Sequence, residues 1–206
     1  MNKAIFLSSN KEKAEEIKRI FKKLDNEKGK FEIIELPEEV KIYDLQTKKL
    51  KKLIDNKIIE GYKLYKRPVI AEHTVLKIHA LKDYPNTQTE FFVNSLHYDE
   101  ICNIMKVYND KSAETETIIA YCNGKKIYYG IGKIKGKIAD IPKGKCKFGW
   151  DNIFIPEGIN KTLAELNEEE MDTYSTRYKA SEELYSQIEK VDDNDETIGI
   201  KDEVID

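Results

Sequence analysis

Cysteine is scarce in this chain of 206 residues, and long apolar runs are missing. The three cysteines, Cys102, Cys122 and Cys146, form no Cys-x-x-Cys pair, which argues against both a disulfide framework and a zinc site. The N-terminus lacks the basic and then apolar layout of a signal peptide, and no apolar run approaches the length of a membrane span. We therefore expect a cytoplasmic protein in a reducing compartment, without contact with a membrane.

An excess of positive charge is missing as well. The chain has 35 Lys and Arg residues against 38 Asp and Glu residues, a formal net charge of −3, which argues against a general affinity for nucleic acid. The hydrophobic fraction of 40% is enough for a sizeable core, although 35% of the residues are charged. These values indicate a soluble globular protein.

Strand and helix patterns alternate along the chain. Short apolar runs predict strands, and apolar residues at helical spacing predict helices. The predicted strands are 4–7, 31–36 and 67–72, and the predicted helices are 11–24, 48–64, 89–105 and 171–188. A meander with its first turn at Asn123-Gly124 is predicted for three further strands, 117–122, 125–130 and 131–138.

This order of elements predicts an α/β fold, a mixed twisted sheet in two lobes flanked by helices around a central cleft. The folded domain would cover residues 1–190, and the acidic tail 191–206 would be disordered by default. The strand 67–72 is predicted to be central and buried, and to deliver Glu72 and His73 to its C-terminal end. Ligands gather at that edge in open α/β sheets.

The first predicted strand enters its helix through Ser8-Ser9-Asn10. Small polar residues at such a turn leave backbone N–H groups and the positive end of the helix dipole pointing at one spot, where phosphate binds well. An ordinary capped surface helix would carry the same residues, so that alternative stays open.

An aromatic segment stands out near the C-terminal end of the chain. Residues 148–154 place Trp150, which is the only Trp, close to Phe148 and Asp151, and Arg177 follows in a later segment. Aromatic rings with charged groups beside them suit a flat polar ring, which they clasp by stacking and by edge hydrogen bonds. A purine is such a ring.

These segments resemble the inosine triphosphate pyrophosphatase family, the non-canonical purine NTP pyrophosphatases. The family pattern Phe-Gly-Trp-Asp-x-x-Phe matches residues 148–154, and Thr-x-Ala-Glu matches residues 162–165. Ser-His-Arg matches residues 175–177, with Thr176 in place of the His. The opening pattern Thr-Gly-Asn-x-x-Lys-x-x-Glu is similar to residues 8–16, with Asn10, Lys13 and Glu16 in register. The resemblance implies a two-lobed α/β fold with a central nucleotide cleft, and a homodimer.

The resemblance also implies roles for the matching residues. The triphosphate would be held by Ser8, Asn10 and Lys13, with Lys13 as a compact positive charge. The base would contact Phe148, Trp150, Asp151, Ser175 and Arg177, and Arg177 would donate to the 6-oxo group of a hypoxanthine or xanthine ring. Magnesium would be held by carboxylates, for which the candidates are Asp44 and Glu72.

Several positions depart from the family pattern, and His73 matters most. It stands where the family has an aspartate near the metal and the attacking water, and Val75 replaces a glycine that permits tight backbone geometry. Histidine can act as a general base, so His73 is the candidate catalytic residue. It cannot supply the anionic oxygen that magnesium selects. Asp44 shortens a metal-binding glutamate, and Met171 replaces a lysine.

Residues implied to grip the base and the phosphates survive, whereas the hydrolytic aspartate does not. We therefore predict a protein that binds ITP, dITP and, by extension, XTP with lost or weak hydrolysis. Similar subunits accompany effector proteins, including sirtuin-like NAD hydrolases in bacterial antiviral systems, which favours a sensor or regulatory subunit. The alternative is an active magnesium-dependent pyrophosphatase that converts these nucleotides to NMP and pyrophosphate. A structural module without a ligand would leave Asn10 and Arg177 unexplained.

Lysines alternate with other residues from Lys133 to Lys137 and again from Lys143 to Lys147. Alternating charge on a strand is typical of a solvated face. The other interpretation is a basic lip beside a polyphosphate cleft or an acidic partner.

Overall fold

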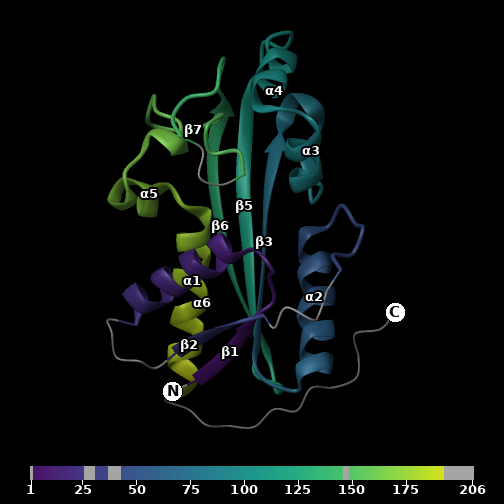
Figure 1. Cartoon of the computed structure of the whole chain (residues 1–206), viewed down its shortest axis with the longest axis vertical. Coiled ribbons are helices and arrows are strands. Elements are labelled where there is room, and N and C mark those ends of the chain that lie inside the picture. The colour runs from purple at the N-terminus through teal and green to yellow at the C-terminus, as the bar shows by residue number, and fades with distance from the viewer. Residues whose placement is uncertain (1, 26–30, 37–42, 146–148, 193–206) are drawn as a thin grey trace.

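The computed structural model of the chain describes residues 2–25, 31–36, 43–145 and 149–192 (Figure 1). At its centre lies one mixed sheet in the order β2-β1-β3-β5-β6-β7, with β4 paired to β3 outside this path. The strands are β1 (Asn2–Phe6), β2 (Phe31–Glu35), β3 (Val69–Ile78), β4 (Tyr84–Asn86), β5 (Ser112–Cys122), β6 (Ile127–Ile138) and β7 (Phe154–Pro156). The predicted mixed α/β sheet is confirmed: β1 lies parallel to β2 and β3, and the other pairs are antiparallel.

Helices cover both faces of this sheet. On one face lie α1 (Lys11–Leu24) and α6 (Thr176–Asp192), and on the other lies α2 (Leu50–Tyr65) (Figure 1). Near the N-terminal end of β5 lie α3 (Thr89–Ser95) and α4 (Tyr98–Met105). The short helix α5 (Glu168–Tyr174) directly precedes α6. The predicted helix 11–24 is confirmed with its bounds, because its apolar residues recur at helical spacing and are all buried, namely Ala14, Ile17, Ile20 and Phe21.

The strand β3 is the central element of the sheet and is longer than predicted. Side chains alternate between the two faces of a strand, so Ile70 packs in the core under α1 and α6, whereas Ala71 and Val75 pack in the core under α2. Glu72 and His73 therefore lie in the middle of the strand and not at its C-terminal end. That prediction was wrong because the polar residues after Ala71 continue the ladder with β5 instead of ending it.

One edge of β3 has a gap in its pairing. Its start pairs with β1 through Val69 and Ile70, and its end pairs with β4 from Leu76 to Ile78. Between these contacts, residues 71–75 pair only with β5 among the described residues. The turn 8–10 and the first turn of α1 follow β1, so the chain leaves the sheet at this gap.

The predicted three-stranded meander is instead one hairpin of two long strands, β5 and β6. The segment around Gly130 suggested a turn, but Gly130 and Gly132 lie inside β6. A Cβ atom on Gly130 would lie 1.9 Å from the Ala180 carbonyl oxygen, and one on Gly132 would lie 1.9 Å from the Thr176 carbonyl oxygen. Glycine therefore serves here to let α6 approach the strand closely.

The two predicted helices in the second half of the chain, 89–105 and 171–188, are each divided into two shorter helices in the structure. Residues 89–105 form α3 and α4, with His97 as the cap of α4 and the Glu100 carboxylate accepting from the His97 backbone N–H at 2.9 Å. Residues 171–188 fall in α5 and α6, which are separated at Ser175. The Ser175 hydroxyl accepts from the Tyr178 backbone N–H at 3.1 Å, so this serine caps α6.

The alternating lysines of β6 lie on a solvated face, as one of the two interpretations predicted. Lys133, Lys135 and Lys137 are exposed, whereas Ile134 and Ile138 between them are buried. Lys147 lies outside the described residues.

Three further predictions concern the cysteines, the membrane-spanning segments and the C-terminal boundary of the domain. Cys102 and Cys122 are buried free thiols, and Cys146 lies outside the described residues. Among the described helices, none is long and apolar enough to cross a membrane. The boundary at residue 190 stays a prediction, because α6 continues to Asp192 and residues 193–206 are not described.

Candidate functional site

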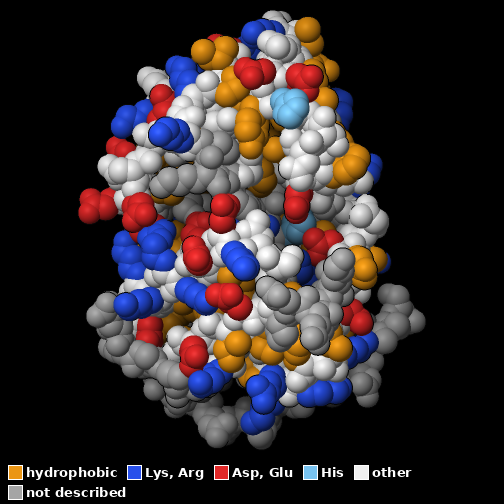
Figure 2. Space-filling model, viewed as in Figure 1, with side chains coloured by type: hydrophobic (Ala, Val, Ile, Leu, Met, Phe, Trp, Pro, Cys, Tyr) orange, Lys and Arg blue, Asp and Glu red, His pale blue; other side chains and the backbone are white. Residues whose placement is uncertain are grey.

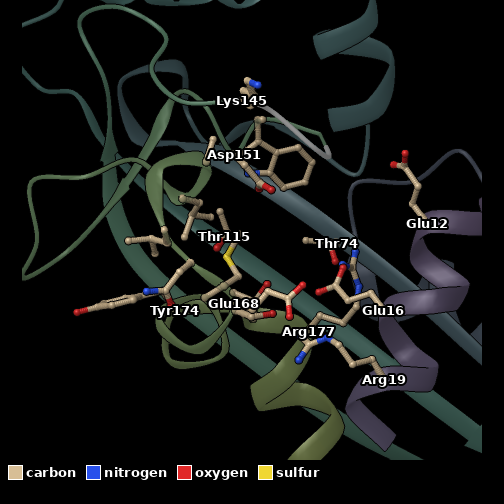
Figure 3. Close-up of a pocket in the computed structure, with 18 of the residues that line it drawn as sticks. Glu12, Glu16, Arg19, Thr74, Thr115, Lys145, Asp151, Glu168, Tyr174 and Arg177 are labelled. Carbon is tan, nitrogen blue, oxygen red and sulfur yellow. The ribbon is translucent and has the colours of Figure 1, made fainter.

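Two adjoining cavities lie beside the gap in β3, and Figure 3 shows the larger one. The larger cavity has a volume of about 650 Å³ and the smaller about 260 Å³, and Glu12, Thr74 and Trp150 border both. Residues from α1, α5 and α6 line the larger cavity, among them Glu16, Arg19, Met171 and Arg177, together with Asp151 from the turn before β7. The smaller cavity lies at the start of α1 and is lined by residues that include Asn10, Lys13, His73 and Tyr98.

The mouth of the larger cavity is acidic. Figure 2 shows Asp and Glu side chains gathered across the middle of the face on which α1 lies. Glu12 and Glu15 of α1 and Glu168 of α5 are exposed and line the larger cavity. The smaller cavity is lined by Glu12 and Glu90 as well, but it also contains Lys13 and the N-cap of α1, which suit negative charge.

The start of α1 forms the floor of the smaller cavity. Asn10 is the N-cap, and its side-chain oxygen accepts from the Lys13 backbone N–H at 3.0 Å. The Ser8 hydroxyl accepts from the Asn10 backbone N–H at 3.2 Å. These contacts are those of an ordinary helix cap, and they orient the remaining N–H groups of the first turn and the positive end of the helix dipole toward the cavity.

A buried ion network joins α1, β3 and α6 behind both cavities. The Glu72 carboxylate lies between Lys13, whose Nζ is 3.4 Å from Oε2, and Arg177, whose terminal nitrogen is 3.2 Å from Oε1. The other terminal nitrogen of Arg177 donates to Glu16. Both Glu72 and Arg177 are buried, so each charge is stabilised mainly by the others.

The charges of this network stay ionised for a physical reason. Burial favours the neutral acid of Glu72, but the charges of Lys13 and Arg177 and a hydrogen bond from Thr74 outweigh burial, so the pKa of Glu72 lies well below its usual range. Burial also opposes the charge of Arg177, but Glu72 and Glu16 hold the pKa of Arg177 above its ordinary value.

Hydroxyl groups extend the network across the sheet. Thr74 on β3 hydrogen-bonds Thr117 on β5 at 2.7 Å, and Thr117 hydrogen-bonds Thr176 at the start of α6, also at 2.7 Å. This chain of hydroxyls links Glu72 to the turn that presents Arg177. The network therefore places the first turn of α6 relative to the centre of β3.

His73 points to the opposite face of β3 from Glu72. Its Nδ1 lies 3.4 Å from Asp44 Oδ2, and the other oxygen of Asp44 lies 2.9 Å from Lys57 Nζ on α2. Burial alone would raise the pKa of Asp44, but the hydrogen bond from His73 and the charge of Lys57 hold this pKa well below its usual range. Asp44 is therefore an ionised partner for the His73 ring.

Asp151 lies on one side of the larger cavity, with Arg177, Glu16 and Glu168 on the other (Figure 3). Trp150 beside it is buried and borders both cavities. Burial, followed by the charge of Glu16, raises the pKa of Asp151 to about 7, although Arg177 acts to lower it. Among the described residues, none donates a hydrogen bond to the Asp151 carboxylate.

The short helix α5 covers the larger cavity from the side opposite β3. Met171 and Tyr174 of α5 line the cavity, and Asp172 between them faces α1. The Asp172 carboxylate accepts from Arg19 at 2.7 Å and pairs with Lys23 at 2.8 Å. The helix α5 is therefore held against α1 by Asp172, the neighbour of Met171, which stands where the family has a lysine.

The structure brings most of the predicted site residues together. The smaller cavity collects Asn10, Lys13 and His73, and the larger collects Trp150, Asp151, Ser175 and Arg177. Phe148 lies outside the described residues. Sequence reasoning gave no role to several residues of the site, namely Glu16, Lys57, Thr74 and Glu168, of which only Glu16, included in the family pattern, carried a signal in the sequence. Lys145 lines the larger cavity, as the interpretation of the alternating lysines as a basic lip beside a cleft allows.

The described residues contain no cluster of three or more His, Cys, Asp or Glu side chains that could hold a metal by themselves. Magnesium is commonly bound by one or two carboxylates together with the phosphates of a substrate. Asp44 fits that requirement because it is ionised and about one third exposed. Glu72 fits less well, because Lys13 and Arg177 already adjoin its carboxylate.

Comparison with known proteins places the chain in a family. Residues 4–187 match the model described as the Ham1 family. A dITP/XTP pyrophosphatase of Saccharolobus solfataricus is 36% identical over 120 residues, which cover 58% of this chain and 62% of that protein. An inosine triphosphate pyrophosphatase of Yarrowia lipolytica is 35% identical over 124 residues, which cover 59% and 65%. The matched segments thus span less than two thirds of these relatives.

Solved structures agree with the predicted architecture. The Ham1 protein of Staphylococcus aureus superposes with a TM-score of 0.74 at 21% identity, over 92% of this chain and 99% of that one. A HAM1 protein of Coxiella burnetii superposes with a TM-score of 0.76 at 22% identity, over 92% and 100%. Such low identities show the fold alone. Because the family model spans residues 4–187, the chain belongs to the Ham1 family, the family of the inosine triphosphate and dITP/XTP pyrophosphatases.

Proposed function

We propose that this protein is a pyrophosphatase for non-canonical purine nucleoside triphosphates, which converts ITP, dITP or XTP to the monophosphate and pyrophosphate. In that reaction water adds to the α-phosphorus, and the bond to the oxygen between the α- and β-phosphates breaks. The observation that carries the proposal is the pair of joined cavities, with Trp150, Asp151 and Arg177 in one and Asn10 and Lys13 in the other. The names of the curated relatives support the same reaction.

The two cavities suit the two ends of a nucleotide. The larger one offers the Trp150 indole for stacking and the polar groups of Asp151, Ser175 and Arg177 for the edge of a base. The smaller one offers the first turn of α1 and Lys13 for the phosphates. Arg177 has only N–H donors, so it pairs with a 6-oxo group and not with the 6-amino group of adenine.

A proton acceptor for the attacking water is available at the smaller cavity. If His73 donates its Nδ1–H to Asp44, its Nε2 is left as an acceptor, and Asp44 stabilises the charge that forms on the ring. This pair would take the place of the aspartate that the family resemblance implies at position 73. The Asp44–His73 pair also explains why a carboxylate is kept at position 44.

Magnesium fits beside this pair through the exposed, ionised carboxylate of Asp44. When bound there, the ion would offset the charge of the phosphates and polarise the phosphorus–oxygen bond. Lys13 would contact the phosphates from the other side of the cavity, and the buried Glu72 would hold Lys13 in place.

Binding without turnover is a second candidate function, favoured by one observation. Glu72 is committed to Lys13, Arg177 and Thr74, and its neighbour is His73 instead of an aspartate. A nucleotide sensor acting with an effector protein, such as a sirtuin-like NAD hydrolase in antiviral defence, would follow from that function. The effector, the homodimer and the cytoplasmic location stay predictions.

Product analysis separates the two functions. The parent protein is incubated with ITP and magnesium, and pyrophosphate release is recorded beside nucleotide binding in calorimetry. We expect release by the parent, and a loss of about 10²-fold or more in kcat for His73→Asn with ITP still bound, because general-base catalysis contributes that much. A parent that binds ITP without releasing pyrophosphate, and that gains turnover on His73→Asp, would support the sensor instead.

A further inference from the structure

Asp151 is half-buried, and its carboxylate is unsatisfied among the described residues. It belongs to the wall of the 650 Å³ cavity, next to the buried Trp150. Its backbone carbonyl accepts from the Ala164 N–H at 3.0 Å, which fixes the main chain. Within the described part of the chain, its side-chain oxygens receive no hydrogen bond, so a ligand in the cavity would be their partner.

The groups that face Asp151 do not form a cationic site. The other charged side chains that line the same cavity are Glu12, Glu15, Glu16 and Arg19 from α1, Lys145 from the segment before Trp150, Glu168 from α5 and Arg177 from α6. Two of the three cations in this lining are engaged elsewhere, since Arg19 pairs with Asp172 and Arg177 pairs with Glu16 and Glu72. An ionised Asp151 therefore gains little from its surroundings.

We propose that Asp151 recognises the base as a neutral carboxylic acid, giving its O–H to the 6-oxo group and accepting the N1–H of a hypoxanthine or xanthine ring. This inference rests on the proposed function for the class of base. It assigns to Asp151 a specificity role that depends on its proton.

Hydrogen-bonding capacity separates the two protonation states. A carboxylate only accepts hydrogen bonds, so it can take the N1–H but repels the neighbouring 6-oxo group. A neutral carboxyl group has one donor and one acceptor side by side, which matches the N1–H and 6-oxo pair. Burial and the charge of Glu16 raise the pKa of Asp151 to about 7, so the neutral form is well populated near neutral pH.

The proposal predicts how affinity depends on pH. If only the neutral form binds, the apparent affinity falls with the fraction of Asp151 that is protonated. With a pKa of about 7, that fraction is about nine tenths at pH 6 and about one tenth at pH 8. ITP should therefore bind about tenfold more weakly at the higher pH.

The variant Asp151→Asn tests this directly, because an amide is a permanent donor–acceptor pair of the same shape. ITP affinity is measured by calorimetry in EDTA at about pH 6 and about pH 8, for the parent and the variant. The triphosphate and the base of ITP change protonation with pH in the same way for both proteins. The ratio of the parent's ITP affinity to the variant's therefore reports the effect of Asp151 alone. We expect similar affinities at the lower pH and an advantage of about tenfold for the variant at the higher pH.

Glu15→Gln is the matched control, since it removes one carboxylate charge at the mouth of the same cavity and should keep the parent's pH dependence. A variant Asp151→Asn that loses ITP affinity at both pH values would overturn the proposal, because it would mean that the ionised form is required. A parent-to-variant ratio that does not change with pH would also overturn it. If the protein releases no pyrophosphate from ITP, the proposed function is contradicted. The binding measurements would still decide whether the neutral form of Asp151 recognises the base.

Discussion

Two carboxylates at the candidate site have pKa values that their surroundings shift in opposite directions. Glu72 is surrounded by Lys13, Arg177 and Thr74, which keep it ionised, whereas burial and Glu16 favour the neutral form of Asp151. Pairs of acidic groups with separated pKa values are typical of sites that divide roles between them. Here Glu72 pairs with the cations Lys13 and Arg177, whereas Asp151 is the carboxylate that we propose for the ligand.

The raised pKa of Asp151 also has a consequence for stability. An unfolded aspartate has a pKa of about 3.9, whereas the folded value is about 7. Between these values the folded state keeps a proton that the unfolded chain releases, so the contribution of Asp151 to the free energy of unfolding falls as pH rises through this window. It levels off above the folded pKa. The fall amounts to at most about 4 kcal/mol, at ~1.4 kcal/mol per pKa unit.

Urea unfolding at about pH 4.5 and about pH 8 checks this for the parent and Asp151→Asn. The variant has no proton to lose at this position, so its stability relative to the parent should rise between the two pH values. Equal pH dependence of the two proteins would show that Asp151 is ionised in the fold.

At this scale, motifs predicted the residues of the site but not their contacts. Asn10, Lys13, Trp150, Asp151 and Arg177 meet at the two cavities as the family resemblance implies. Their partners could not be predicted, because a buried charge is stabilised by groups distant in the sequence. Arg177, for example, is paired with Glu16 and Glu72 across 161 and 105 positions of the chain.

Among the elements, the spacing of apolar residues predicted the bounds of α1 correctly. The lengths of β5 and β6 and the division of the later helices were predicted wrongly. The sequence predicted a break between strands at Gly130, yet in β6 both Gly130 and Gly132 permit the close approach of α6. Ser175 lies within a helical pattern but caps α6, which separates it from α5. Both errors come from tertiary packing, which local spacing does not contain.

Gly132→Ala tests the importance of this packing for the site. The added Cβ would lie 1.9 Å from the Thr176 carbonyl oxygen, directly before Arg177, so either β6 or the first turn of α6 must move. We expect a loss of about 1–3 kcal/mol in the free energy of unfolding, as for other overpacked positions, together with weaker ITP binding.

Urea denaturation and calorimetry measure the two effects of Gly132→Ala. Lys135→Ala is the control, because Lys135 is exposed on the same strand and its change should cost less than about 0.5 kcal/mol. A Gly132→Ala protein as stable as the parent would mean that α6 is not held by this contact.

For the molecule as a whole, the order of the strands is what creates the site. Because β1 pairs with only the first residues of β3 and β4 pairs with only its last, the middle of β3 borders α1 at an open edge of the sheet. Residues from both ends of the chain, such as Lys13 and Arg177, meet there around Glu72. The sequence predicted the mixed α/β class, but only the pairing of β3 shows where the cleft lies.

The central claim is that this cleft selects a 6-oxopurine triphosphate and cleaves it between the α- and β-phosphates. A single reaction with magnesium and equal amounts of ITP and ATP tests both parts, with nucleotides and pyrophosphate separated by chromatography. We predict IMP and pyrophosphate as products and a kcat/KM for ITP at least about tenfold above that for ATP, since an unpaired buried polar group costs about 1–3 kcal/mol. Equal consumption of the two nucleotides, or no release of pyrophosphate, would contradict the account.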